Sequence, residues 1–170
     1  KITSAIEKML NENDGLILGI CNGFQALIKT GLLPYGEVRQ IEATSPTLTY
    51  NNNARHIARI VQTRAVNTTS PWTRELSDSA IYKIPVSHGE GRFICSEESF
   101  AELNANGQIA FLYEDNPNGS AYNIEGILSP CGRILGKMAH SERIADNLYK
   151  NMPDLIPQPI IKSDVNYFKK

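Results

Sequence analysis

A cysteine lies between two glycines where an apolar run ends, in the order Gly19-Ile20-Cys21-Asn22-Gly23. This G-x-C-x-G spacing matches the G-x-S-x-G elbow, in which a nucleophile occupies a tight turn from a strand into a helix. The turn brings neighbouring side chains close together, so small residues are needed two positions to each side. A thiol there lies at a helix N-terminus, where the dipole favours the thiolate and backbone amides can stabilise an oxyanion. The spacing therefore indicates that Cys21 is a nucleophile.

The alternative for Cys21 is an inert packing residue, because free cysteines are among the most buried residue types. The other two cysteines have no elbow around them: Cys95 is expected in the core and Cys131 in an exposed turn. Three widely separated cysteines form neither a disulfide framework nor a metal site. We therefore expect no metal and a reducing, cytoplasmic location.

A nucleophilic thiol needs a base, and the base needs an orienting partner. His140 ends an expected strand, and Glu142 follows it two residues later. In an extended segment, residues i and i+2 face the same side, so the carboxylate can accept a hydrogen bond from one ring nitrogen and leave the other for the thiol. Of the other histidines, His56 is expected on a solvated strand face and His88 at a junction between strands.

The elements that must position these residues are of mixed type. Residues 16–20 are apolar without alternation, as in a parallel strand covered on both faces, and the spacing of Phe24, Leu27 and Ile28 predicts a helix directly after the cysteine. The mixture indicates an α/β fold with an open mixed, largely parallel sheet flanked by helices. Further strands are expected within 56–66, 81–96, 109–115 and 125–140, and further helices within 1–10, 97–107, 141–150 and 160–168.

The composition narrows the classes of partner. The 170 residues include 17 basic and 18 acidic ones, so the overall charge favours neither nucleic acid nor a membrane surface as a partner. No apolar run approaches the roughly 18 residues that a membrane span needs. The length suits one domain with a substantial core.

Several of these stretches together resemble a known family. "GICNGFQAL" is similar to the nucleophile motif of the triad (class I) glutamine amidotransferases, and "AHSER" to their histidine-x-glutamate motif. With "SPW", "HGEGRF" and "GRILGKMAHSER", the chain resembles the glutaminase domain of phosphoribosylformylglycinamidine synthase over roughly residues 5–149. The resemblance implies a flavodoxin-like core.

The resemblance also assigns roles to residues. It implies that Cys21 is the nucleophile, His140 the general acid and base, and Glu142 the carboxylate that orients the histidine. The residues that it implies contact the glutamine substrate are Gln25, Asn22, Gly23, His88 and Gly89. For His88 and its neighbours Glu90 and Arg92, the alternative is a structural turn held by local hydrogen bonds.

The implied reaction is hydrolysis of glutamine through a cysteine thioester. The ammonia would pass to a synthetase domain or subunit that makes phosphoribosylformylglycinamidine in purine biosynthesis. ATP and magnesium would bind to that partner, and no cofactor is expected in this chain. The alternatives are another cysteine glutaminase or glutamyl hydrolase, and a catalytically inactive module that binds a synthetase.

The sequence departs from the family pattern in two places. Ser141 follows the histidine where the family usually has proline, and we expect this serine to cap the next helix. A glycine-rich loop that contributes to the family's oxyanion hole has no counterpart in the sequence. We therefore expect residues 1–170 to form the C-terminal two thirds of a glutamine amidotransferase domain, with little or no activity alone.

Overall fold

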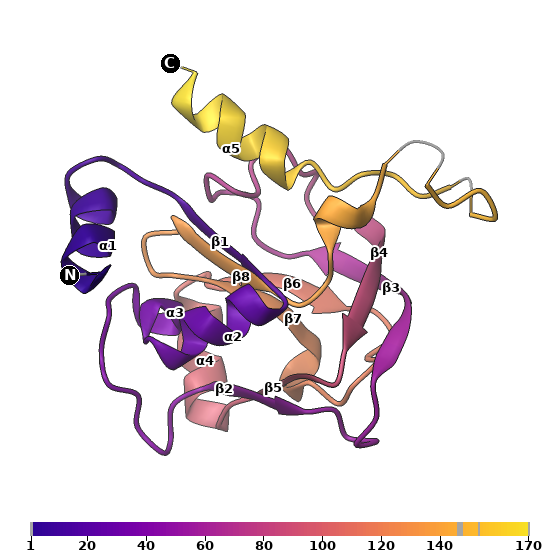
Figure 1. Cartoon of the computed structure of the whole chain (residues 1–170), viewed down its shortest axis with the longest axis horizontal. Helices are drawn as coiled ribbons and strands as arrows, with labels where there is room; N and C mark the ends of the chain where they lie inside the picture. Colours follow the sequence, from indigo (N-terminus) through magenta and orange to yellow (C-terminus); the bar gives the residue numbers. More distant parts are fainter. Residues whose placement is uncertain (1, 146–147, 153, 170) are drawn as a thin grey trace.

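A mixed sheet of six strands forms the centre of the protein, and a second sheet of two strands lies beside it (Figure 1). The computed structural model describes residues 2–145, 148–152 and 154–169. The large sheet has the strand order β1 (Ile17–Ile20), β8 (Ile134–Lys137), β7 (Ile124–Leu128), β6 (Ile109–Tyr113), β3 (Ile57–Ala65) and β4 (Ile81–His88), and the small sheet pairs β2 (Thr47–Tyr50) with β5 (Glu90–Ile94).

The strand directions confirm an α/β fold with a mixed sheet but correct one expectation. Among the described strands, only β1 and β8 pair in parallel, with Ile17 opposite Ile134. The pairs β8–β7, β7–β6, β6–β3 and β3–β4 are all antiparallel. A parallel pair needs a crossover of a dozen or more residues, whereas residues 129–133 alone join β7 to β8. The prediction of a largely parallel sheet is therefore wrong for the described strands.

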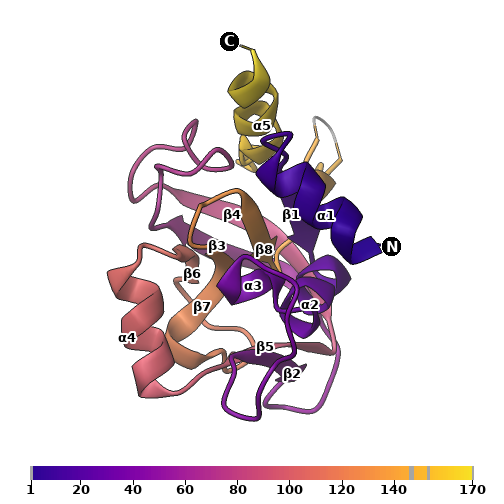
Figure 2. The same cartoon turned by 90° about the vertical axis from the view of Figure 1, so that its left-hand side faces the viewer.

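Helices cover the sheet on both sides, which places the core in two layers. The helices are α1 (Ile2–Asn11), α2 (Asn22–Lys29), α3 (Leu32–Tyr35), α4 (Glu97–Ala105) and α5 (Ile160–Phe168), with two short 3-10 turns, η1 (Ala121–Asn123) and η2 (Ser141–Arg143). Figure 2 shows α2 and α3 next to each other against the sheet and α5 at the far end of the molecule. No helix in the described ranges is long and apolar enough to cross a lipid bilayer.

Neighbouring residues of one strand serve the two layers, because side chains alternate along a strand. Ile134 packs with Phe24 of α2, whereas Leu135 packs with Trp72 and with Ile160 of α5. Gly136 brings α2 close to β8, since a Cβ atom there would lie 2.2 Å from the Phe24 ring. The elbow after β1 is therefore held between α2 and the β1–β8 edge of the sheet.

The helix expected over 141–150 is not found. Residues 141–143 form only the 3-10 turn η2, whose N-cap residue is His140, so Ser141 does not cap it. Its hydroxyl instead accepts a hydrogen bond from Lys137 and donates one to Gln158. Residues 146 and 147 lie outside the described part of the chain. The serine side chain therefore anchors the segment to the sheet rather than starting a helix.

Candidate active site

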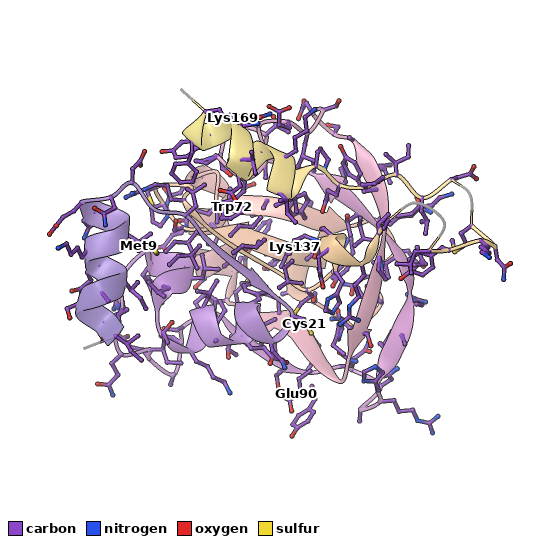
Figure 3. All side chains as sticks on the ribbon, turned by 45° about the horizontal axis from the view of Figure 1, so that its top comes forward. Met9, Cys21, Trp72, Glu90, Lys137 and Lys169 are labelled. Carbon is purple, nitrogen blue, oxygen red and sulfur yellow. The ribbon has the colours of Figure 1, made fainter. Side chains whose placement is uncertain are left out.

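Cys21 occupies a strained turn between β1 and α2 (Figure 3). Its φ of 54° and ψ of −107° lie in a region that non-glycine residues rarely adopt, and such a conformation costs about 1–3 kcal/mol. The Cys21 amide donates a hydrogen bond to the Lys137 carbonyl at 2.8 Å, and the Cys21 carbonyl accepts one from Gln25. The structure therefore contains the elbow that the G-x-C-x-G spacing predicts.

The two glycines of the elbow differ in what they permit. A Cβ atom on Gly19 would lie 2.5 Å from the Leu27 side chain and 2.6 Å from the carbonyl carbon of Gly23. A Cβ atom on Gly23 would meet no atom within 4 Å. Close approach of the strand to the helix therefore requires glycine at position 19 but not at position 23.

This difference predicts opposite results for two alanine substitutions. Gly19→Ala is expected to lower the free energy of unfolding by about 1–3 kcal/mol, because the added methyl overpacks the elbow. Gly23→Ala, the matched control, is expected to leave it unchanged or raise it by up to about 1 kcal/mol, since alanine favours helix. Urea unfolding curves of both variants test this. An equal loss for both would contradict the role assigned to Gly19.

His140 and Glu142 form the pair expected from their spacing. His140 Nδ1 lies 2.6 Å from Glu142 Oε1, so Nδ1 carries the proton and donates to the carboxylate. The His140 ring is buried, and its Nε2 atom has no hydrogen-bond partner within the described residues. The His140 amide donates to the Pro85 carbonyl at 2.8 Å, which fixes the turn after β8 against β4. With Nδ1 bound to the carboxylate, the Nε2 atom is the ring nitrogen left to act as a base.

One cleft of about 550 Å³ brings most of the predicted residues together. Of the predicted site residues, six line it: Cys21, Asn22, Gln25, His88, Gly89 and His140. Glu142 stands behind the histidine and is not part of the lining, and neither is Gly23. The Cys21 sulfur also lies 3.9 Å from the Ser87 carbonyl oxygen. The volume of the cleft is within the range of small-molecule binding sites.

The "HGEG" segment is both a held turn and a wall of this cleft. Asn51 Nδ2 donates to the carbonyls of His88 and Arg55, so its Oδ1 atom accepts from His88 Nδ1 at 3.0 Å. Burial, with help from His56 and His140, lowers the pKa of His88 to about 4, so this histidine is neutral at physiological pH. Gln25 Nε2 donates to the Glu90 carbonyl at 2.7 Å. Gln25 therefore holds the segment that faces the nucleophile.

Burial raises the pKa of the Cys21 thiol. The Asn22 amide and the Arg143 guanidinium lower it, Glu142 raises it further, and burial is the largest of these effects. The amide at the helix N-terminus thus favours the thiolate as expected, but burial outweighs its effect on the pKa of Cys21. The thiol must lose its proton to a base before it can attack.

Some residues of the cleft were not predicted from the sequence. His56, expected on a solvated face, is exposed but lines the cleft, and its Nε2 atom lies 3.1 Å from the Ser87 hydroxyl. Arg143 also lines the cleft and lies 3.6 Å from the Glu142 carboxylate. The position of Arg143 directly after Glu142 was the one sequence feature that could have predicted it as a residue of the cleft. Within the described ranges, no group of three or more histidines, cysteines and carboxylates could hold a metal ion.

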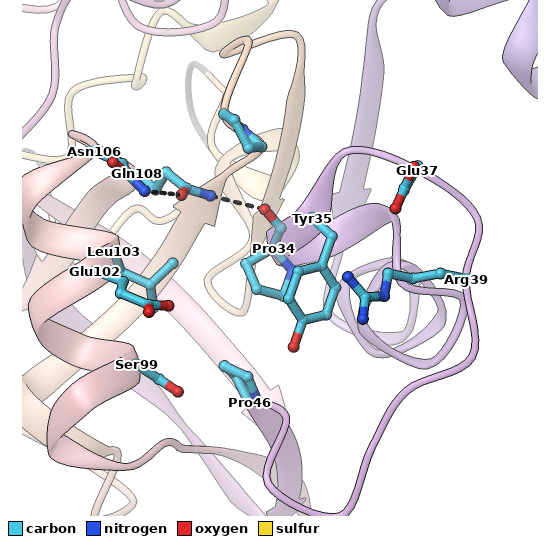
Figure 4. A pocket seen from close by; sticks show the side chains of 11 residues that line it. Pro34, Tyr35, Glu37, Arg39, Pro46, Ser99, Glu102, Leu103, Asn106 and Gln108 are labelled. Atoms are coloured by element: carbon cyan, nitrogen blue, oxygen red, sulfur yellow. Dashed lines mark hydrogen bonds between the residues drawn. The ribbon is translucent and has the colours of Figure 1, made fainter.

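A second hollow, of about 230 Å³, lies between α3 and α4 and contains none of the predicted residues (Figure 4). The Arg39 guanidinium lies over the Tyr35 ring at 4.3 Å, and Gln108 Nε2 donates to the Pro34 carbonyl at 2.8 Å. The second contact joins α3 to the loop between α4 and β6, and no cysteine or histidine lines the hollow.

The fold and the site define an α/β protein with a cysteine on a strand–helix elbow and a histidine–carboxylate pair in the same cleft. Residues 1–170 match the CobB/CobQ-like glutamine amidotransferase domain, and the chain belongs to this family. The family resemblance inferred from the motifs is therefore confirmed.

Solved structures agree with this assignment. PurLQS from Thermotoga maritima is 29% identical, with a TM-score of 0.77 over 98% of this chain and 68% of that chain. The glutaminase domain of Trypanosoma brucei CTPS, with bound acivicin, is 17% identical, with a TM-score of 0.56 over 96% of this chain and 65% of that chain. A glutamine amidotransferase from Thermotoga maritima is 18% identical, with a TM-score of 0.50 over 99% of this chain and 62% of that chain. The last two likenesses concern the fold alone, and this chain spans less than two thirds of each.

Proposed function

We propose that this chain hydrolyses glutamine through a thioester on Cys21. The observation that carries the proposal is that Cys21, on its strained elbow, lines one cleft together with His140, whose ring is hydrogen-bonded to Glu142. Membership of the glutamine amidotransferase family supports glutamine as the substrate.

The proposed first half-reaction releases ammonia. His140 Nε2 takes the proton from the Cys21 thiol, and the thiolate attacks the carboxamide carbon of glutamine. The amides of Asn22 and Gly23, at the start of α2, stabilise the oxyanion that forms. His140 then gives its proton to the leaving nitrogen as the C–N bond breaks, which leaves a glutamyl thioester.

The second half-reaction restores the enzyme. His140 Nε2 takes a proton from water, and the resulting hydroxide attacks the thioester carbon. The C–S bond breaks, glutamate leaves, and the sulfur regains the proton. Glu142 keeps the His140 ring in one tautomer throughout and stabilises the imidazolium that forms after each proton transfer.

Charges at the rim of the cleft suit the other end of the substrate. Free glutamine carries an α-carboxylate and an α-ammonium group. Arg143 and Glu90, which are both exposed and both line the cleft, supply one charge of each sign. We propose that this pair selects a free amino acid over a peptide glutamine.

We further propose that the ammonia passes to a synthetase partner. The support is the similarity to PurLQS and the resemblance of the motifs to phosphoribosylformylglycinamidine synthase. The partner would bind ATP and magnesium and use the ammonia to make phosphoribosylformylglycinamidine in cytoplasmic purine biosynthesis.

A glutamine-shaped electrophile tests the proposed chemistry. Acivicin is expected to modify Cys21, and excess glutamine is expected to protect it, because both molecules would enter the same cleft. Peptide mass spectrometry of the labelled chain locates the adduct, with Cys95 and Cys131 as internal controls. Labelling of either control instead of Cys21, or labelling that glutamine does not slow, would contradict the proposal.

A further inference from the structure

Two charged side chains are completely buried within the large sheet beneath the site. Glu125 on β7 and Lys137 on β8 are both 0% exposed, and Lys137 Nζ lies 3.3 Å from Glu125 Oε1. Removing two ions from water is costly, and an apolar pair of similar size often gives equal or greater stability. Stability alone therefore does not account for this pair, and its contacts indicate a different use.

Lys137 makes three polar contacts through its side chain. Besides Glu125, Nζ donates to the Ala139 carbonyl at 2.7 Å and to the Ser141 hydroxyl at 3.0 Å. These three acceptors match the three N–H donors of an ammonium group. Burial lowers the pKa of Lys137, and Glu125 and Glu142 oppose that change.

The two residues that flank His140 in the chain, Ala139 and Ser141, are both hydrogen-bonded to the ion pair. The Ala139 amide donates to Glu125 Oε1 at 2.7 Å, so this residue is held at its N–H by the carboxylate and at its C=O by the ammonium. Ser141, on the other side of His140, accepts from Lys137 and donates to the buried Gln158 side chain at 2.6 Å. The backbone around the histidine has little freedom to move.

The main chain of Lys137 holds the nucleophile. Its carbonyl accepts the hydrogen bond from the Cys21 amide at 2.8 Å. A single residue thus contacts the elbow through its backbone and both neighbours of His140 through its side chain. Figure 3 shows Lys137 and Cys21 near each other at the centre of the molecule.

We infer that Lys137, charge-paired with Glu125, sets the position of His140 relative to Cys21, and that both are positioning residues for the reaction. The inference rests on the proposed function. Neither residue lines the cleft, so each acts through the His140 backbone rather than on the substrate.

Removing the charges singly and together separates positioning from stability. Lys137→Met leaves Glu125 buried without its partner, so this variant is expected to unfold at a much lower temperature. The double variant Lys137→Met/Glu125→Gln contains no buried charge at the pair, and its unfolding temperature is expected to return toward that of the unmodified protein. Lys29→Met/Glu7→Gln, on two exposed helix residues, is the matched control.

The double variant is nevertheless expected to be a poor catalyst. With the chain assembled with its synthetase, kcat for glutamine is expected to fall about 100-fold, because misplacing a catalytic group by about 1 Å has an effect of that size. KM is expected to stay within about threefold, since the cleft lining is intact. A double variant that is stable and has unchanged kcat would overturn the inference.

A second readout does not depend on turnover. In a Cys131→Ala background, the pH midpoint for alkylation of Cys21 by iodoacetamide is expected to shift in the double variant but not in the control, because the distance to His140 changes. Ser141→Ala, which retains both charges, is expected to lower kcat about 2- to 10-fold, because the hydrogen bonds of its hydroxyl with Lys137 and Gln158 are lost. No effect of this milder change would also count against the inference, even if the double variant did not fold.

The two proposals fail differently. If the unmodified assembly hydrolyses no glutamine, the proposed function is wrong. If it hydrolyses glutamine, and the Lys137 and Ser141 variants match it in both kcat and alkylation midpoint, only the positioning role is wrong.

Discussion

Replacing Cys21 with alanine is expected to abolish glutamine-dependent synthesis, with a loss of about a million-fold in kcat, because no thioester can form without the sulfur. Synthesis from added ammonia is expected to continue at its original rate, since the proposed synthetase partner would not use the thiol. Steady-state assays of the assembled enzyme with each nitrogen source measure both rates. Because Cys21→Ala changes the side-chain volume only slightly, unfolding of the variant would not explain so large a loss of kcat.

Cys131→Ala is the matched control, because it removes a cysteine from an exposed turn outside the cleft. Its glutamine-dependent rate is expected to equal that of the unmodified enzyme. If Cys21→Ala retained glutamine use, the thioester mechanism would have to be abandoned whatever the control showed.

Glu142→Gln is expected to lower kcat by about 10³- to 10⁴-fold with little change in KM. The glutamine side chain is nearly the same size, but it carries no charge to stabilise the imidazolium and does not enforce the Nδ1–H tautomer of His140. Glu142 is not part of the cleft lining, so the binding of glutamine is expected to survive. Rates at saturating and limiting glutamine separate kcat from KM.

The exposed Glu37 offers the same substitution away from the cleft, and Glu37→Gln is expected to leave both parameters unchanged. A large rise in KM with a normal kcat for Glu142→Gln would instead assign this carboxylate to substrate binding. Rescue by Glu142→Asp, even partial, would support the need for a negative charge beside His140.

The elbow and the histidine–carboxylate pair could be predicted because both are local. Gly19 and Cys21 lie within one turn of chain, and the spacing of His140 and Glu142 places their side chains on one side of an extended segment. Their convergence depends on the parallel pairing of β1 with β8, which brings Ile20 opposite Lys137 and so places both strand ends at one edge.

Features that depend on distant contacts escaped prediction. Residues 16–20 are apolar, and Ile17 and Leu18 of β1 pack into different parts of the core. That signal does not reveal that the other described strands pair in antiparallel fashion. Nothing near Asn51 in the sequence shows that its side chain fixes His88. Serine is a residue type that often caps a helix, but in this structure the hydroxyl of Ser141 accepts a hydrogen bond from the Lys137 ammonium instead.

The three thiols of this protein differ in a way that affects its durability. Burial raises the pKa of the half-buried Cys21. Partial burial also raises the pKa of Cys131, but hydrogen bonds and charge from Ser129 and Arg133 outweigh it and lower that pKa overall. Peroxides and simple alkylating agents react with accessible thiolates, so Cys131 offers them the easier target. The proposed nucleophile, Cys21, is thus less exposed to oxidation between turnovers. Oxidants are expected to react first with Cys131, which lies in a turn outside the cleft, so this oxidation does not affect the reaction.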